Sequence, residues 1–110
     1  MTILNLFKLE ENVSVVTGAG KGIGKGIAIA LAQAGSNLVL ASRTKSDLID
    51  VQKEIKKIGK EAIVVPIDVT NPESIEALSE KTIKEFGKIS TWVNNACLLY
   101  TSDAADDRMR

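Results

Sequence analysis

A glycine-rich run from Thr17 to Gly24 has the residue types and spacing of a phosphate-binding turn. It follows a short β-branched segment, residues 13–17, and it opens a segment whose apolar residues recur at helical spacing. Glycines lack a Cβ, so the backbone can turn sharply and its peptide groups can approach a pyrophosphate. The helix that follows directs unpaired N–H groups and its positive dipole end toward an anion. The run predicts a dinucleotide site, although a glycine-rich turn without a ligand remains the alternative.

The spacing of the glycines separates this run from two common nucleotide motifs. The third residue after Gly20 is Ile23, which excludes the fingerprint G-x-G-x-x-G at that position, and no Gly-Lys pair is followed by the Ser or Thr of a phosphate loop. The pattern that fits is T-G-x-x-x-G-x-G, which is formed by Thr17, Gly18, Gly22 and Gly24.

Strand-like and helix-like segments alternate along the chain. The predicted strands cover residues 13–17, 38–41, 63–67 and 90–94. The predicted helices run from Ile23 to a C-cap at Gly35, from Lys45 to Ile58 with a C-cap at Gly59, and from about residue 70 to Gly87. The last helix has two possible starts, because either Thr70 caps it with Glu73 as capping-box partner or Asn71 caps it with Pro72 in the first turn.

This alternation predicts an α/β fold, a Rossmann-like doubly wound parallel sheet with strand order 3-2-1-4 that is truncated after the fourth strand. The direction of winding reverses between strands 1 and 4, so a crevice is expected at the carboxyl ends of the strands. Segments distant in sequence meet at that edge, namely residues 18–24, Ser42 and Arg43, Asp68 and Val69, and residues 94–96.

The end of the second strand indicates which dinucleotide is bound. An acidic side chain there accepts hydrogen bonds from the ribose of NAD, whereas an arginine suits the 2′-phosphate of NADP. This chain has Ser42-Arg43-Thr44, and Lys21 in the glycine run offers a second positive charge. NADP is therefore favoured over NAD, unless both cations are merely solvated surface charges.

The glycine pattern resembles that of the short-chain dehydrogenase/reductase family, of the classical type. Asp68-Val69 matches the place where the family has an acidic residue that meets the adenine amino group, and Asn94-Asn95-Ala96 resembles its N-N-A-G motif after strand 4. In that motif the first Asn steadies the central sheet and the backbone passes the cofactor ribose. The set of cofactor-binding residues predicted in this way is Thr17, Gly18, Lys21, Gly22, Ile23, Gly24, Ser42, Arg43, Asp68, Val69, Asn94 and Ala96.

The resemblance stops after Ala96, where Cys97 replaces the expected glycine. Residues 1–96 are interpreted as the N-terminal part of a dinucleotide-binding domain, and residues 97–110 as a non-native or divergent tail without regular structure. The family's catalytic residues, a Ser and a Tyr-x-x-x-Lys pair, have no match here, since the position four after Tyr100 is Ala104. No catalytic residue is assigned, and we expect the chain alone to be inactive.

The resemblance implies a parent oxidoreductase that transfers hydride between NADP(H) and a carbonyl or alcohol substrate, and that forms a homo-oligomer. A non-catalytic NADP-binding module stays open, and a methyltransferase is disfavoured because its adenosyl ribose also requires an acidic residue after strand 2. The net charge of +0 over 110 residues predicts a soluble protein with no nucleic-acid or membrane partner. The single cysteine, which cannot form an internal disulfide, fits a cytoplasmic setting. No metal site is expected, since the chain has no His and one Cys.

Overall fold

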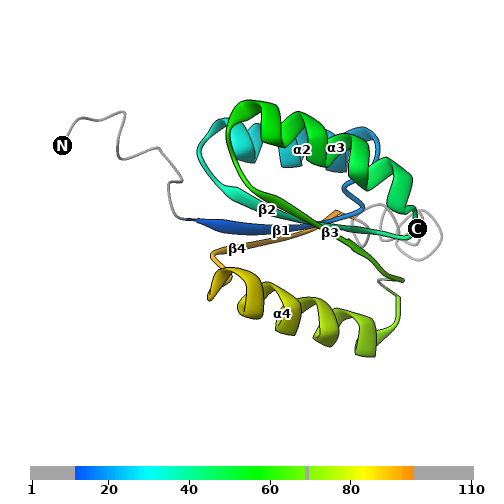
Figure 1. Ribbon diagram of the computed structural model, residues 1–110. Helices are drawn as coiled ribbons and strands as arrows, with labels where there is room; N and C mark the ends of the chain where they lie inside the picture. Colours follow the sequence, from blue (N-terminus) through cyan, green and yellow to red (C-terminus); the bar gives the residue numbers. More distant parts are fainter. Residues whose placement is uncertain (1–11, 69, 96–110) are drawn as a thin grey trace, which may run out of the picture.

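Parallel strands in the order β3-β2-β1-β4 form the sheet of the computed structural model, which describes residues 12–68 and 70–95 (Figure 1). These strands are β1 (Val13–Thr17), β2 (Asn37–Ser42), β3 (Ala62–Pro66) and β4 (Thr91–Asn94). The α/β class and the strand order that the sequence predicts are confirmed. Within the described part of the chain, β4 lies at one edge of the sheet and β3 at the other.

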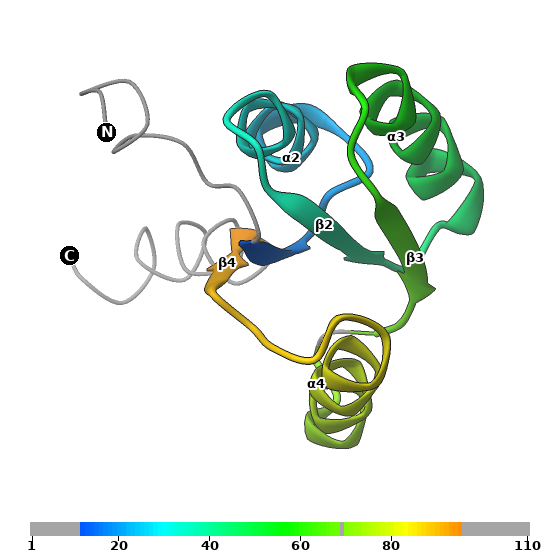
Figure 2. The ribbon, with the colours of Figure 1, turned by 60° about the vertical axis from the view of Figure 1, so that its left-hand side comes forward.

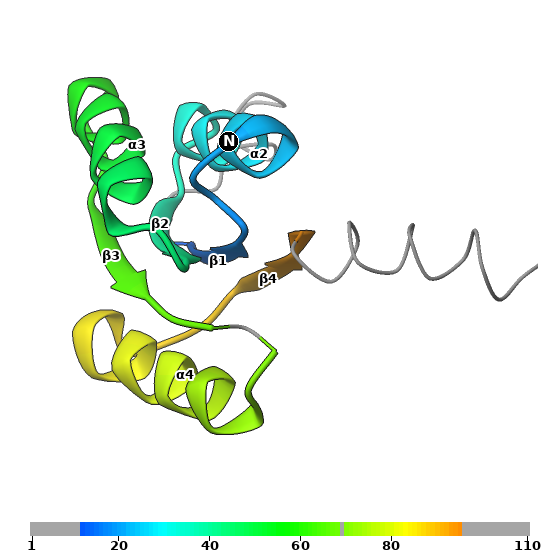
Figure 3. The same ribbon diagram turned by 90° about the vertical axis from the view of Figure 1, so that its right-hand side faces the viewer.

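Helices cover both faces of the sheet (Figures 1 and 2). They are α2 (Gly22–Gln33), α3 (Lys45–Ile58) and α4 (Pro72–Phe86). Figure 3 shows α2 and α3 together on one side and α4 on the other. This arrangement is that of a doubly wound sheet, in which the crossovers before and after the reversal of winding pass over opposite faces.

Alternate residues of the interior strands enter two separate cores. Leu38 and Leu40 of β2 pack with Leu48 and Ile55 of α3, whereas the intervening Val39 belongs to the core on the α4 side. Burying one such aliphatic side chain contributes about 1.5–3 kcal/mol. Both faces of β1 and β2 are therefore covered, which explains why these strands read as nearly continuous apolar runs.

The start of α4 resolves the two alternatives left by the sequence. Asn71 is the N-cap, because its side-chain oxygen accepts a hydrogen bond of 2.9 Å from the backbone N–H of Glu73. Pro72 follows at the first helical position, where its missing N–H costs nothing. The capping box headed by Thr70 is thus wrong, because the Thr70 hydroxyl is bonded to Asp68 instead.

Other element ends lie within one residue of the prediction. Gly59 and Gly87 are the C-caps of α3 and α4 as expected, but the C-cap of α2 is Ala34, and Gly35 follows it in the left-handed region. β2 extends one residue further at each end, β3 begins and ends one residue earlier, and β4 begins one residue later. Ser90 stays outside β4 although its side chain accepts a hydrogen bond from the Val13 N–H.

The register brings the carboxyl ends of the strands to one edge. Thr17 at the end of β1 is level with Ala41 of β2 and with Asn94 of β4. Beyond the strands, the Ala19 N–H donates to the Ala41 carbonyl at 3.3 Å, and the Ile67 N–H donates to the Ser42 carbonyl at 2.9 Å. The turns that carry the predicted site residues are therefore held beside one another.

Candidate functional site

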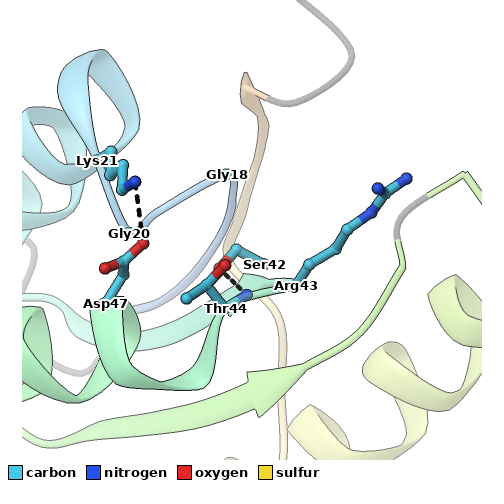
Figure 4. Close-up of a pocket in the computed structure, with 7 residues that line it drawn as sticks. All are labelled: Gly18, Gly20, Lys21, Ser42, Arg43, Thr44 and Asp47. Carbon is cyan, nitrogen blue, oxygen red and sulfur yellow. Dashed lines mark hydrogen bonds and ion pairs between the residues drawn. The ribbon is translucent and has the colours of Figure 1, made fainter.

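A pocket of about 280 Å³ lies at this edge, beside the turn that follows β1 (Figure 4). It is formed by the glycine turn (residues 18–20), by Lys21, by the end of β2 and by the first turn of α3. The lining residues are Gly18, Gly20, Lys21, Ser42, Arg43, Thr44 and Asp47.

The glycine turn is packed tightly against the start of α2. Gly18 has a φ of 64°, in the region that favours glycine. A Cβ built on Gly24 would overlap the carbonyl oxygen of Gly18 and lie 2.7 Å from the side-chain nitrogen of Asn95. The close approach of helix and turn thus requires glycine at position 24, as the sequence pattern suggests.

The N-terminus of α2 lacks the capping groups that the start of α4 has. Its N-cap is Lys21, whose side chain forms no capping hydrogen bond, and its first turn contains no acidic residue. In α4, by contrast, Asn71 caps the helix and Glu73 lies in the first turn. Backbone donors and a positive dipole end without a local acceptor are the features that bind anions at helix starts.

Two asparagines at the end of β4, its last residue Asn94 and the following Asn95, tie the glycine turn to the sheet. The Thr17 hydroxyl donates to the side-chain oxygen of Asn94 at 3.0 Å, and Asn95 donates from its side-chain nitrogen to the Gly18 carbonyl at 3.3 Å. The Asn95 side chain is only 2% exposed. Sequence reasoning selected Asn94 and missed Asn95, although a second amide directly after a strand was the available signal.

The end of β2 contributes a turn closed by a Ser42 hydrogen bond and the cationic side chain of Arg43. Ser42 accepts a hydrogen bond of 3.3 Å from the Thr44 N–H through its hydroxyl oxygen. The Arg43 side chain is 73% exposed and extends away from the glycine turn, toward the segment after β3 (Figure 4). There its guanidinium lies 3.5 Å from a carboxylate oxygen of Asp68.

Asp68, two residues after β3, accepts hydrogen bonds that favour its ionised form. The Thr70 hydroxyl and the Thr70 N–H both donate to the same carboxylate oxygen, at 2.6 and 3.0 Å. These bonds, chiefly the one from the hydroxyl, lower the pKa of Asp68. Burial opposes them to a smaller extent, and the nearby Arg43 lowers this pKa by less still. Asp68 is thus a carboxylate acceptor that lies beside the pocket's arginine.

A carboxylate that sequence reasoning did not select also lines the pocket. Asp47 lies in the first turn of α3, and its carboxylate is 3.6 Å from the ammonium of Lys21. The search for an acidic residue was confined to the end of β2, whereas Asp47 reaches the pocket from the following helix. Spacing along the chain gives no signal for this position, because α3 and the glycine turn meet only in the folded protein.

The structure brings together only part of the predicted set. Gly18, Lys21, Ser42 and Arg43 line the pocket, and Asp68 lies outside the lining but forms an ion pair with Arg43. Thr17 and Asn94 are hydrogen-bonded to each other at the ends of β1 and β4, and Gly24 packs against Gly18. Neither these three residues nor Gly22 and Ile23, the latter 66% exposed, line the pocket. Val69 and Ala96 lie outside the described residues, as does the tail predicted for residues 97–110.

Neither a metal-binding cluster nor a membrane-spanning helix is present in the described residues. Among residues 12–68 and 70–95, no cluster of His, Cys, Asp and Glu side chains has the composition of a metal site. In the same part of the chain, none of the helices combines the length and apolar character that a bilayer crossing demands.

Comparison with known proteins places this geometry among dehydrogenases. The model of the short chain dehydrogenase family matches residues 12–109. An uncharacterized oxidoreductase of Mycobacterium tuberculosis is 42% identical over 93 residues, which are 84% of this chain and 35% of that protein. The chain thus spans about a third of the length of this relative.

Two solved structures show the same fold with different cofactors. A 7α-hydroxysteroid dehydrogenase complexed with NADH and 7-oxo glycochenodeoxycholic acid matches with a TM-score of 0.81 and 33% identity, over 86% of this chain and 37% of that one. A metagenomic short-chain oxidoreductase in complex with NADP matches with a TM-score of 0.72 and 32% identity, over 76% of this chain and 38% of that one. Both forms of the cofactor therefore occur among the neighbours.

Proposed function

Because the chain belongs to the short-chain dehydrogenase family, we propose that it is the NADP(H)-binding part of an oxidoreductase acting on a carbonyl or alcohol substrate. The observation that carries this proposal is the composition of the pocket. Gly18 and Gly20 of the turn lie in this pocket with Lys21, the N-cap of α2, and with Ser42 and Arg43. The Arg43 guanidinium extends from there toward Asp68, and the end of β2 holds no carboxylate. The pocket therefore combines donors for a diphosphate with a cation for an additional phosphate.

The residues of the site fit the parts of such a cofactor. The glycine turn and the first turn of α2 would hold the diphosphate, since the helix start has no side-chain cap and no acidic residue in its first turn. Arg43 and Lys21 would hold the 2′-phosphate, and the Asp68 carboxylate would accept from the adenine amino group. Further roles for Ile23, Val69, Asn94 and Ala96 stay predictions from the resemblance.

The preference for NADP over NAD is proposed on the chemistry of Arg43. A guanidinium forms charge-assisted, bidentate hydrogen bonds with a phosphate. Its present partner Asp68 is 3.5 Å away at an exposed position, and exposed ion pairs of this kind contribute about 0–1 kcal/mol. A doubly charged phosphate therefore competes well with Asp68 for the arginine.

The residues present in this chain would bind the cofactor, and they do not include the residues that would transfer a proton. The bound nicotinamide would give or accept the hydride, and the residues described here would position and orient the cofactor. The proton-transferring Tyr and Lys and the Ser that the resemblance implies have no counterpart in the 110 residues, so the chain alone is proposed to bind the cofactor without turnover. The whole protein is proposed to act in the cytoplasm as a homo-oligomer.

The test is a comparison of cofactor affinities in the wild type and in Arg43→Asp. We expect wild-type chain to bind NADPH more tightly than NADH, and the substitution to weaken NADPH binding by about 10- to 100-fold, because charge-assisted hydrogen bonds are lost. NADH affinity should stay unchanged or rise. The measurement is a fluorescence titration of each reduced cofactor.

The matched control is Lys45→Asp, which reverses an exposed charge two residues further on without altering the pocket lining. It should leave the preference unchanged. Equal affinities for both cofactors in the wild type, or an equal loss in both variants, would contradict the proposal. In a longer protein that carries these residues, NADPH oxidation by carbonyl compounds separates an enzyme from a non-catalytic binding module.

A further inference from the structure

Asp47 lies in the pocket proposed for the 2′-phosphate, although no acidic residue stands at the end of β2 (Figure 4). Its side chain is 27% exposed, compared with 82% for its partner Lys21. A Cβ built on Gly20 would lie 2.8 Å from the Cβ of Asp47, so the first turn of α3 is packed closely on the glycine turn. The position of the Asp47 backbone is therefore fixed relative to the pocket.

The two members of the Lys21–Asp47 pair differ in how strongly they act on a pocket ligand. The Lys21 ammonium is highly exposed, so solvent and salt screen its charge. The more sheltered Asp47 carboxylate is screened less and is an acceptor only. At a separation of 3.6 Å between the charged atoms, this ion pair contributes little to stability, so Lys21 does not depend on Asp47 for its place.

We propose that Asp47 is a specificity-determining residue that limits the preference for NADPH over NADH. Its carboxylate repels a phosphate in this pocket and is able to accept a hydrogen bond from a ribose hydroxyl there. The inference rests on the proposed function, because it assumes that the ribose end of the cofactor occupies this pocket. By this proposal a residue of α3 helps to select between NADPH and NADH, whereas the common sequence pattern places that selection at the end of the second strand.

The test is Asp47→Asn, which removes the charge and keeps the shape of the side chain. We expect NADPH to bind about three- to tenfold more tightly, because a like charge a few ångströms from the phosphate is gone. NADH should bind equally well or more weakly, so the ratio of the two affinities rises. Adenosine 2′,5′-bisphosphate and AMP, measured by calorimetry, should reproduce the difference without the nicotinamide.

The matched control is Asp50→Asn, which removes the same charge from an exposed position of α3 that does not line the pocket. It should leave the affinity ratio within about twofold of the wild type, because an exposed charge at that distance is screened. A second variant, Asp47→Ser, should act like Asp47→Asn, and thermal melts confirm that each variant is folded.

The outcomes separate this inference from the proposed function. Wild-type chain that binds neither cofactor contradicts both. Wild-type chain that prefers NADPH, with a ratio that Asp47→Asn leaves unaltered or that Asp50→Asn raises equally, contradicts the inference alone. A lower NADPH affinity in Asp47→Asn would also overturn it, because Asp47 would then be positioning Lys21 for the phosphate.

Discussion

The glycine turn and the charged rim of the pocket (Lys21, Arg43, Asp47 and Asp68) are held in place in different ways. The backbone of the turn is fixed by a hydrogen bond from the buried Asn95 side chain and by close packing against the start of α2. Most charges of the rim lie on exposed side chains joined by loose ion pairs of 3.5–3.6 Å. The comparison indicates that packing sets the shape of the site, whereas its charges can change without disturbing the fold.

The largest effect on stability is expected from Gly24→Ala, which disturbs the packing of the glycine turn. The new methyl group would overlap the Gly18 carbonyl and approach the Asn95 side chain, so backbone must shift. We expect a loss of at least about 3 kcal/mol in the free energy of unfolding, since overpacking against backbone has no cheap relaxation. Urea denaturation followed by circular dichroism measures it.

Gly26→Ala is the matched control for that substitution. It lies in the same helix, and a Cβ there meets nothing within 4 Å. It should raise the free energy of unfolding by about 0.5–1 kcal/mol, because alanine is the better helix former. Equal destabilisation by both variants would show that the close contact at Gly24 does not matter.

A smaller effect is expected from Asn95→Ala, which removes the buried amide but adds no clash. The Gly18 carbonyl would lose its hydrogen bond from Asn95, at a cost of about 1–3 kcal/mol. Both cofactors should bind more weakly, because the turn itself loosens while the rim charges are kept. Thermal melts and titrations with NADPH and NADH measure these effects. If only NADPH bound more weakly, Asn95 would act on the charged rim and not on the glycine turn.

The smallest effect is expected from Thr70→Val at the outer end of the rim. The variant removes the hydroxyl hydrogen bond that contributes most to lowering the pKa of Asp68, so this pKa should rise toward its ordinary value of 3.8. A lowered folded-state pKa stabilises the protein above pH 3.8, and this contribution is lost as the pH falls through the lowered value. Thr70→Val should therefore reduce the stability difference between neutral and acidic pH.

The measurement for Thr70→Val is an NMR titration of the Asp68 side-chain carboxyl carbon. Because the carboxylate is exposed, the melting temperature at neutral pH should hardly change. An unaltered Asp68 titration would mean that the Arg43 charge, and not the Thr70 hydroxyl, holds this group ionised.

The sequence predicted the parts of the molecule that local rules determine. The glycine that ends α3 follows from backbone conformation, and the strand order follows from the handedness of crossovers. For α4 the local rules allowed two starts, of which the structure has the one at Asn71-Pro72. Strand ends were less accurate, because a residue such as Ser90 can bond to its neighbour strand without joining the ladder.

Asp47 and Asn95 could not be selected in the same way. Each reaches the pocket or its turn through tertiary packing, Asp47 from α3 onto Gly20 and Asn95 from the end of β4 onto Gly18. Motif spacing describes neighbours along the chain, whereas these contacts join segments that only the folded sheet brings together. The direction in which the Arg43 side chain extends could not be predicted from the sequence either, because an exposed side chain has several rotamers.

The most direct test of the 2′-phosphate site is an NMR comparison of chemical shifts on addition of NADP⁺ and of NAD⁺. Amides of the glycine turn and of the first turn of α2 should move with both cofactors. The side-chain Nε–H of Arg43 and the amide of Thr44 should move further with NADP⁺ than with NAD⁺. Identical shifts with both cofactors, or an Arg43 signal that responds to neither, would contradict a phosphate site at the end of β2.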